Sequence, residues 1–224
     1  MLNINFVELA HDSPEFDAAY DVISQDIPPE YLETREFLKN RLRVRDEGPK
    51  QLQERLLLQD GYTLHLIAAM EGGRVIGSIY GHLISSITNE NRAIGFVTYI
   101  TVLPEYRRRG IATSLIGALH KTVDDDSLRL TDRPVFGIVY EIEEQGKEEI
   151  KTTVSCLGAK PLDIVYYQPA LRLGYEPEGM NLWFQPCPAL SSEQAIGFTL
   201  SAQVVRDIVR NMLVLIRRAG IEGF

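Results

Sequence analysis

The chain has 224 residues, of which 45% are hydrophobic and 24% charged, as is ordinary for a soluble globular protein. This length suits one sizeable domain, with or without an added element. The 31 acidic and 23 basic residues give a net charge of −8, which argues against non-specific nucleic-acid binding because that needs cations to neutralise phosphates. An acidic surface is compatible with a cationic substrate, although acidity also serves solubility.

Cysteine usage and the N-terminus indicate where the protein works. Cys156 and Cys187 have no metal-type spacing, and two cysteines in a chain this long are typical of a reduced protein. The N-terminus, up to Phe16, has neither the basic nor the apolar segment of a signal peptide. No apolar run approaches the length of a membrane span. We therefore expect a cytoplasmic protein without a metal and without a nucleic-acid or membrane partner.

The first part of the chain predicts a strand, two helical stretches and a hairpin. Residues 3–9 alternate apolar and polar side chains, as in a half-buried strand. Ser13-Pro14-Glu15 has the composition of a helix start, with Ser13 as N-cap and Pro14 in the first helical position. A charged helical stretch follows over residues 30–59. Residues 62–70 and 75–83 predict two strands, since Glu-Gly-Gly-Arg between them is typical of a hairpin turn.

The next stretch, residues 93–123, carries the clearest chemical signal. An apolar and β-branched run over residues 94–102 predicts a buried strand. Pro104 ends it, because proline has no N–H with which to continue a central ladder. The spacing that follows predicts a helix, which we expect to end near residues 124–126. Its apolar stripe consists of Ile111, Leu115, Ile116, Leu119 and Val123.

Three arginines and a glycine, residues 107–110, lie between that strand and that helix. A helix N-terminus presents unpaired backbone N–H groups and the positive end of the helix dipole. Gly110 and Ala112 keep side chains small where an anion would approach the backbone, and the arginines add positive charge. This combination is typical of a pyrophosphate site.

The order of strand, Val102-Leu103-Pro104, Arg107-Arg108-Arg109-Gly110-Ile111-Ala112 and helix resembles the pyrophosphate loop of the GNAT superfamily of acyl-CoA-dependent N-acyltransferases. The signature of that loop is Arg/Gln-x-x-Gly-x-Gly/Ala after a Val-x-Pro. The resemblance implies an α/β fold, with a mixed, largely antiparallel sheet whose splayed parallel strands are flanked by helices. It also implies acetyl-CoA, or another acyl-CoA, as cosubstrate. The residues that it implies for cofactor binding are Ile100, Thr101, Val102, Arg107, Arg108, Arg109, Gly110, Ile111, Ala112 and Thr113.

The second half of the chain continues the same pattern. Residues 135–140 predict a strand parallel to the one before the turn, because a helix joins the two. A helix is expected over residues 148–157, with Gly158 just beyond its end. Strands are expected over residues 164–171 and 181–187, joined by a glycine-rich hairpin loop.

The C-terminal segment has the apolar spacing of a helix over residues 201–216. Its stripe must be buried against the sheet or against a second subunit, which leaves a homodimer open. We expect one GNAT-like domain over residues 1–190 and a C-terminal helical extension, residues 191–224, packed on the same domain.

Candidates for the chemistry are few. Glu141, at the exit of the strand facing the gap implied by the resemblance, is the candidate general base, since burial there would raise its pKa. Tyr166 and Tyr167 are candidate acids, and a strand turns only one of two adjacent residues inward. Many members of the superfamily carry a tyrosine four residues before the glycine of a Leu-Gly pair, as the acid that protonates the thiolate; that position here is Val154.

The sequence therefore predicts an N-acetyltransferase that moves an acyl group from acetyl-CoA to a primary amine of a small molecule or peptide in a ternary complex. A longer acyl donor, as in acyl-amino-acid synthases, is an alternative that an enlarged gap between the splayed strands would favour. The valine at position 154 favours a third interpretation, a non-catalytic acyl-CoA-binding or regulatory module.

Overall fold

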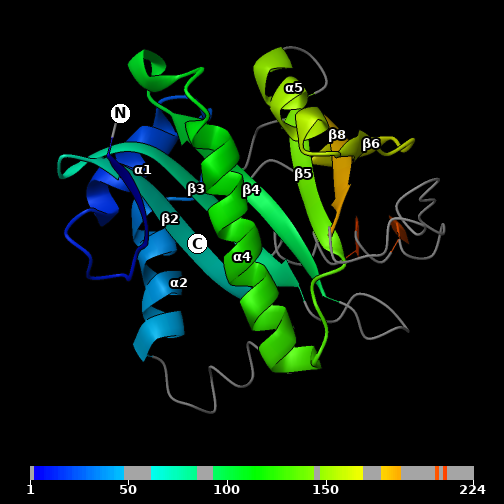
Figure 1. Cartoon of the computed structure of the whole chain (residues 1–224), viewed down its shortest axis with the longest axis horizontal. Helices are drawn as coiled ribbons and strands as arrows, with labels where there is room; N and C mark the ends of the chain where they lie inside the picture. Colours follow the sequence, from blue (N-terminus) through cyan, green and yellow to red (C-terminus); the bar gives the residue numbers. More distant parts are fainter. Residues whose placement is uncertain are drawn as a thin grey trace.

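The computed structural model describes residues 3–47, 62–84, 93–143, 147–168 and 178–187, together with 205, 206, 209 and 210. They form a mixed sheet with helices on both faces (Figure 1). The strands are β1 (Ile4–Glu8), β2 (Tyr62–Glu71), β3 (Arg74–Ile84), β4 (Ile94–Val102), β5 (Gly137–Glu143), β6 (Lys160–Pro161), β7 (Tyr166–Gln168) and β8 (Glu178–Pro186). The helices are α1 (Phe16–Ser24), α2 (Arg35–Glu47), α4 (Ile111–Thr131) and α5 (Glu148–Cys156), with a 3₁₀ turn, η2 (Pro104–Tyr106), before α4.

The sheet has the predicted mixed character. Its strand order is β1-β2-β3-β4-β5-β8-β6, and β7 pairs with β8. Described neighbours run antiparallel except β4 and β5, which are parallel. The β4–β5 ladder extends only from Gly95–Ile138 to Val97–Tyr140, after which the two strands diverge (Figure 1). The prediction of splayed parallel strands in a largely antiparallel sheet is confirmed.

A bulge lies in β4 where this divergence begins. Tyr80 of β3 pairs with Tyr99, but the next residue, Gly81, pairs with Val97, so Thr98 is an extra residue in β4. A bulge bends a strand and re-aims its side chains, and such irregularities are frequent beside active sites.

Helices cover both faces of the sheet (Figure 1). α4 lies across one face, and the apolar stripe predicted for it is buried there as a continuous core. On the opposite face α1 and α2 cover a second cluster, which includes Tyr80 and Tyr99. α4 approaches the sheet closely at Gly81, where an added Cβ would lie 2.6 Å from Cδ2 of Leu119. Among the helices that the structure describes, none combines the length and apolar character that crossing a bilayer requires.

Two helix boundaries differ from the prediction. α4 continues past residues 124–126 to Thr131 and ends at Asp132, which has a left-handed backbone (φ 56°). The aspartates do not stop the helix because each has a partner: Asp124 accepts the Val135 N–H, Asp125 pairs with Lys121, and Asp126 pairs with Arg129. At the other boundary, Ser13 is not an N-cap. Its Oγ accepts the N–H of Ala10 (2.8 Å), and α1 begins only at Phe16.

The remaining predicted elements are present where the structure describes them. The β2–β3 hairpin turns at Gly72 and Gly73, both with positive φ, and Gly158 follows α5 with φ 88°. α2 accounts for part of the helical stretch predicted over residues 30–59, of which 48–59 lie outside the described residues. Likewise, residues 169–171 of the predicted strand over 164–171 lie outside them.

In the predicted C-terminal helix, the described residues 205, 206, 209 and 210 are helical, and the rest of 201–216 lies outside the described residues. Val209 packs against an apolar cluster that includes Val139 of β5 and Phe184 of β8. Packing of the whole extension, residues 191–224, on the same domain stays a prediction.

Candidate active site

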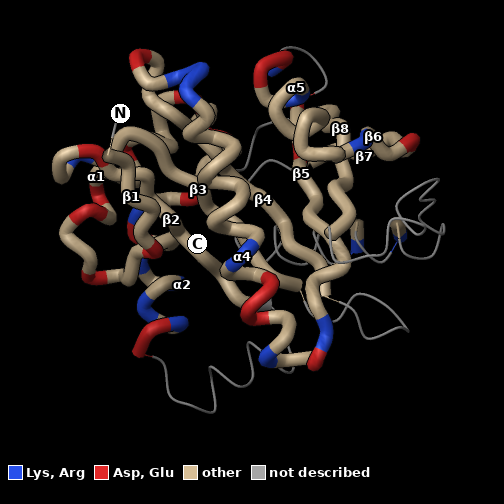
Figure 2. Tube along the Cα trace, viewed as in Figure 1, with Lys and Arg blue, Asp and Glu red and all other residues tan. Residues whose placement is uncertain are grey.

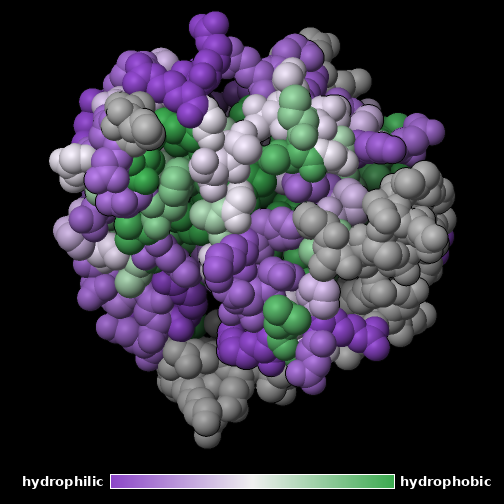
Figure 3. Space-filling view, viewed as in Figure 1, coloured by the Kyte–Doolittle hydropathy of each residue, from purple (hydrophilic) through white to green (hydrophobic). Residues whose placement is uncertain are grey.

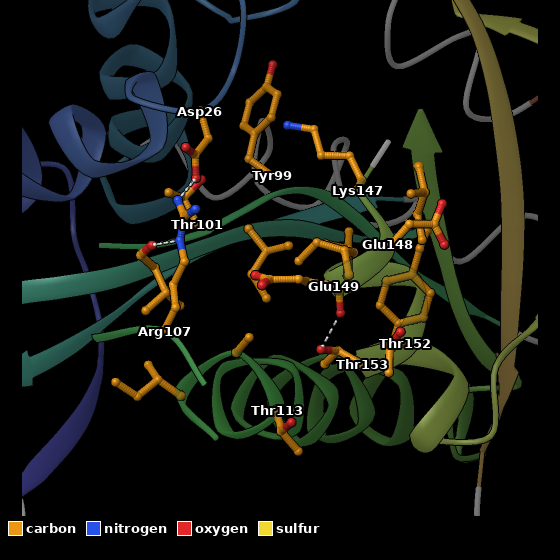
Figure 4. Close-up of a pocket in the computed structure, with 18 of the residues that line it drawn as sticks. Asp26, Tyr99, Thr101, Arg107, Thr113, Lys147, Glu148, Glu149, Thr152 and Thr153 are labelled. Carbon is orange, nitrogen blue, oxygen red and sulfur yellow. Dashed lines mark hydrogen bonds and ion pairs between the residues drawn. The ribbon is translucent and has the colours of Figure 1, made fainter. Parts of the chain in front are cut away.

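A pocket of about 750 Å³ occupies the space between the diverging ends of β4 and β5. The turn between η2 and α4 borders it on one side and the start of α5 on the other (Figure 4). The same side of the molecule has blue Lys and Arg segments at the turn and red carboxylate segments at the start of α5 (Figure 2). Hydrophilic side chains project over the turn, and the surface is hollowed beside it (Figure 3). The pocket is therefore open to solvent and can admit an elongated ligand.

The N-terminus of α4 is shaped to receive an anion. Gly110 is its N-cap residue, with φ 78°, and no side chain caps the helix there. Gly110, Ile111, Ala112 and Thr113 all line the pocket. An added Cβ at Gly110 would meet no atom within 4 Å, so space remains for a ligand beside the backbone. Uncapped N–H groups at a helix N-terminus, in an open cradle, fit the pyrophosphate of a CoA ester.

The three consecutive arginines have different surroundings. Arg107 and Arg108 line the pocket, and Arg109 does not. Arg109 instead lies over the ring of Tyr106, 5.4 Å from its centroid. Arg107 donates from Nε to the Val102 carbonyl (2.8 Å) and from Nη2 to Asp26 (2.6 Å). Arg108 therefore remains the strongest of the three as a side-chain partner for a phosphate.

The strand side of the pocket is β4 beyond its last pair with β5. Ile100, Thr101 and Val102 line it, as the resemblance implies. Within the described part of the chain, the buried hydroxyls of Thr98 and Thr101 have no hydrogen-bond partner, and both residues line the pocket. The unpaired edge of β4 and these hydroxyls offer hydrogen bonds to an extended polar ligand.

Glu141 of β5 also lines the pocket. Burial raises the pKa of its carboxyl to about 7, and the nearby hydroxyl of Tyr166 offsets part of that rise. Its Oε1 is buried and has no partner in hydrogen-bonding geometry among the described residues. A carboxyl with this pKa in a ligand-sized pocket can accept a proton near neutral pH.

The two adjacent tyrosines of β7 point to opposite sides. Tyr166 is buried and Tyr167 is 61% exposed. Burial, followed by the charge of Glu141, raises the pKa of the Tyr166 hydroxyl far above its ordinary value. Neither tyrosine is among the residues that line the pocket, although Tyr166 lies beside Glu141. The structure thus brings Tyr166 to the site and leaves Tyr167 outside it.

Among the pocket-lining residues that sequence reasoning did not assign to the site are Asp26, Tyr99, Tyr140 and Lys147. Asp26 belongs to the segment after α1 and Lys147 immediately precedes α5, so neither was near a recognisable motif. Figure 4 shows the Lys147 side chain extending across the pocket toward Tyr99. Tyr99 and Tyr140 lie within apolar runs, which predicted strands at those positions but no role in a site.

The position expected for an acid holds no polar side chain. Val154 of α5 is fully buried in the core and does not line the pocket. Tyr140 of β5 lines the pocket, and its hydroxyl donates to Oε1 of Gln185. Burial raises the pKa of this hydroxyl, so it holds its proton firmly.

The histidines do not contribute to the site. His65 lies in a separate cluster, with Nδ1 2.8 Å from Glu8 and Nε2 3.4 Å from Asp126. His82 is buried against Tyr80 and Phe96. Across the described ranges, no group of His, Cys, Asp and Glu side chains could hold a metal ion.

Comparisons with known proteins agree with this geometry. The sequence model described as the acetyltransferase (GNAT) family matches residues 24–130. A comparison with curated protein sequences gives no match.

Solved structures share the fold at low sequence identity. A protein assigned to the GNAT family of acetyltransferases from Bacteroides thetaiotaomicron has a TM-score of 0.52 and 17% identity, covering 86% of this chain and 91% of its own. A chain of the NatC complex, crystallised with Gag peptide and CoA, has a TM-score of 0.56 and 15% identity. That match covers 82% of this chain and 98% of the NatC chain. Arabidopsis thaliana Naa50, in complex with the bisubstrate analogue CoA-Ac-MVNAL, has a TM-score of 0.55 and 11% identity. That match covers 83% of this chain and 100% of the Naa50 chain.

The family match includes β4, the arginine-rich turn and most of α4, which are the elements that carried the resemblance in the sequence. The structural matches extend over more than four fifths of the chain. Residues 24–130 thus belong to the acetyltransferase (GNAT) family, and the chain as a whole has the fold of the GNAT acetyltransferases.

Proposed function

We propose that the protein transfers an acetyl group from acetyl-CoA to a primary amine by direct attack in a ternary complex. One observation carries the proposal: a single pocket joins the uncapped N-terminus of α4 to the buried carboxyl of Glu141. The first feature suits a pyrophosphate, and the second suits removal of a proton from an amine. The diverging ends of β4 and β5 leave room between them for the acyl-bearing arm.

The chemistry requires that one bond forms and one breaks. The amine nitrogen forms a bond to the thioester carbonyl carbon, the carbon–sulfur bond breaks, and CoA leaves as a thiolate. Glu141 accepts the proton that the amine loses, and its pKa of about 7 suits that role near neutral pH. Backbone N–H groups of β4 near Thr101 are the candidates to polarise the carbonyl, because this part of β4 has no pairing with β5.

Among the described residues, the positions considered for the acid offer little help to the departing thiolate. Val154 cannot donate a proton, and Tyr140 and Tyr166 both have raised pKa values that make them weak acids. We infer that the thiolate leaves without a dedicated tyrosine. This departure from the superfamily pattern lowers the expected assistance to the leaving group but does not remove the base or the binding of the cosubstrate.

The acceptor is proposed to be an amine of a small molecule or peptide. The structural relatives crystallised with peptide ligands support a peptide amine, and they share only the fold with this chain. Glu141 supports an acceptor that arrives as an ammonium ion, because the carboxylate can first pair with the cation and then take its proton.

The test is mass spectrometry of the purified protein incubated with acetyl-CoA and either a panel of amines and peptides or a cell extract. We expect new N-acetylated products together with release of free CoA, and both should form about 10²–10⁴-fold more slowly with the Glu141→Gln variant. Acyl-CoA esters of increasing chain length, run in parallel, identify the preferred donor. Binding of acetyl-CoA without any product would contradict catalysis and favour a regulatory acyl-CoA-binding module.

A further inference from the structure

Arg107, the first arginine of the turn, is held by groups of the protein itself. Its Nη2 donates to Oδ2 of Asp26 at 2.6 Å, and its Nε donates to the carbonyl of Val102 at 2.8 Å. Asp26 and Arg107 are 81 positions apart in the sequence, and both line the pocket. Figure 4 shows the two side chains meeting at one wall of the pocket.

These contacts give Arg107 a task other than phosphate binding. Two acceptors in the plane of the guanidinium fix its orientation, and the charge of Asp26 offsets its own. The side chains of Arg107 and Asp26 are 36% and 33% exposed, so solvent screens their charges in part, while the two hydrogen bonds fix the direction of the guanidinium. Arg107 therefore joins the end of β4, the turn before α4 and the segment after α1.

A second set of bonds holds the far end of that segment. The Tyr99 hydroxyl donates to the Tyr31 carbonyl (2.9 Å) and accepts the Glu33 N–H (3.2 Å). The residues from Asp26 to Glu33 are thus tied to β4 or its turn at both ends, beside the pocket. This arrangement makes the wall of the pocket on the α1 side continuous with the turn before α4.

We propose that Asp26 is a positioning residue: through Arg107 it holds the turn before α4 in the shape that receives the pyrophosphate, and it couples that turn to the segment between α1 and α2. The inference rests on the proposed binding of acyl-CoA at this turn. It assigns Arg107 to the framework of the site, whereas the resemblance implied direct contact with the cofactor.

Calorimetry with CoA and a matched pair of variants tests the inference. Asp26→Asn and Glu105→Gln each remove one negative charge beside the turn, but Glu105 lies on η2, pairs with Arg74 and does not line the pocket. We expect Asp26→Asn to weaken CoA binding about tenfold, as for loss of a charged hydrogen bond, and Glu105→Gln to change it less than about twofold. If Asp26→Asn bound CoA as tightly as the wild type, or more tightly, Asp26 would only compete with the phosphates for Arg107. That result would overturn the proposal.

A double-mutant cycle with Arg107→Gln gives a second test that does not depend on one variant. If Asp26 acts through Arg107, the double variant loses no more affinity than either single variant. Additive losses would mean that Arg107 contacts the phosphates independently, which contradicts the positioning role.

Acetyl-CoA has a pyrophosphate and S-acetylpantetheine has none. Comparing these two acetyl donors distinguishes a role in positioning the pyrophosphate-binding turn from a general effect on the structure. For Asp26→Asn we expect the KM for acetyl-CoA to rise about tenfold with kcat nearly unchanged, and kcat/KM for S-acetylpantetheine to stay at the wild-type value. An equal loss with both donors would overturn the proposal. Failure of the wild-type protein to bind CoA would instead overturn the proposed function, and this inference with it.

Discussion

The two sides of the pocket are built in different ways. The proposed cosubstrate side consists of β4, the turn and the start of α4, which are continuous in sequence, and much of its chemistry lies in backbone N–H groups. The opposite side draws on separate segments, with Glu141 on β5 and Lys147 before α5. There the side chains carry the chemistry. We expect the first side to recognise a fixed ligand, whereas the second can change its residues without changing the fold.

This contrast predicts how each side responds to substitution. A change at the α4 N-terminus acts through the shape and charge of the backbone cradle, so it should affect cosubstrate binding. A change at Glu141 removes one functional group, so it should affect turnover and leave binding intact.

The largest expected effect is at Gly110. Gly110→Asp places a carboxylate beside the proposed pyrophosphate, and we expect CoA affinity to fall at least about a hundredfold, corresponding to about 3 kcal/mol of lost binding free energy. Gly110→Asn is the matched control, because Asn and Asp tolerate the left-handed backbone (φ 78°) about equally. Calorimetric titration with CoA compares them. Equal affinities in the two variants would place the phosphates elsewhere.

Glu141→Gln tests the other side. We expect turnover with the true acceptor to fall by about 10²–10⁴-fold, the usual range for general acid–base catalysis, while the Kd for CoA changes little. In the wild type, kcat/KM should decline as pH falls below about 7, because the base becomes protonated, and the variant should lose this acidic limb. A decrease of less than about threefold would exclude Glu141 as the base.

Although Glu141→Gln should lower turnover, we expect it to increase the stability of the folded protein above neutral pH. The folded-state pKa of Glu141 is raised from 4.5 to about 7, so the folded protein loses stability as pH rises from about 4.5 to about 7. Glu141→Gln removes this loss, and we expect it to raise the free energy of unfolding by about 1–3 kcal/mol at pH 8, with less effect at pH 5. Urea denaturation at the two pH values measures it. Destabilisation at pH 8 would show that the carboxylate has a partner that stabilises its charge.

The features that could be predicted from the sequence are those encoded by consecutive residues. The turn and α4 were predictable because strand, proline, arginines, glycine and apolar stripe occupy about thirty consecutive positions with clear local signals. The fold followed from the order of these elements and from the strand–helix–strand crossover.

Contacts between segments that are distant in sequence could not be placed in the same way. Nothing local in the sequence shows that Asp26 meets Arg107, or that Tyr99 bonds to the segment before α2. The inward direction of Tyr166 depends on the register of β7 against β8, which alternation alone leaves open. The predicted end of α4 was wrong for a related reason. One of its aspartates, Asp124, is satisfied by the N–H of Val135, which lies beyond the helix and could not be identified from local sequence.

The smallest predicted effect lies away from the pocket. Burial lowers the pKa of His65, but hydrogen bonds and charges from Asp126 and Glu8 outweigh it, so the net pKa is raised above 6.5. The protonated histidine therefore stabilises the fold fully below about pH 6.5, and this contribution is lost as pH rises through the higher folded-state pKa. His65→Gln should reduce the free energy of unfolding more at pH 6 than at pH 9, and urea denaturation at the two pH values measures the difference. Equal destabilisation at both values would show that His65 is neutral in the folded protein.

Thermal denaturation of the wild-type protein with acetyl-CoA is the most direct test of the central claim, that the pocket between β4 and β5 binds an acyl-CoA. A ligand that binds only the folded state adds RT ln(1 + [L]/Kd), or about 2.7 kcal/mol at a hundredfold excess over Kd. We predict a rise in melting temperature of several degrees with acetyl-CoA that Gly110→Asp abolishes and Gly110→Asn largely retains. No rise in the wild type with millimolar acetyl-CoA or CoA would contradict the account.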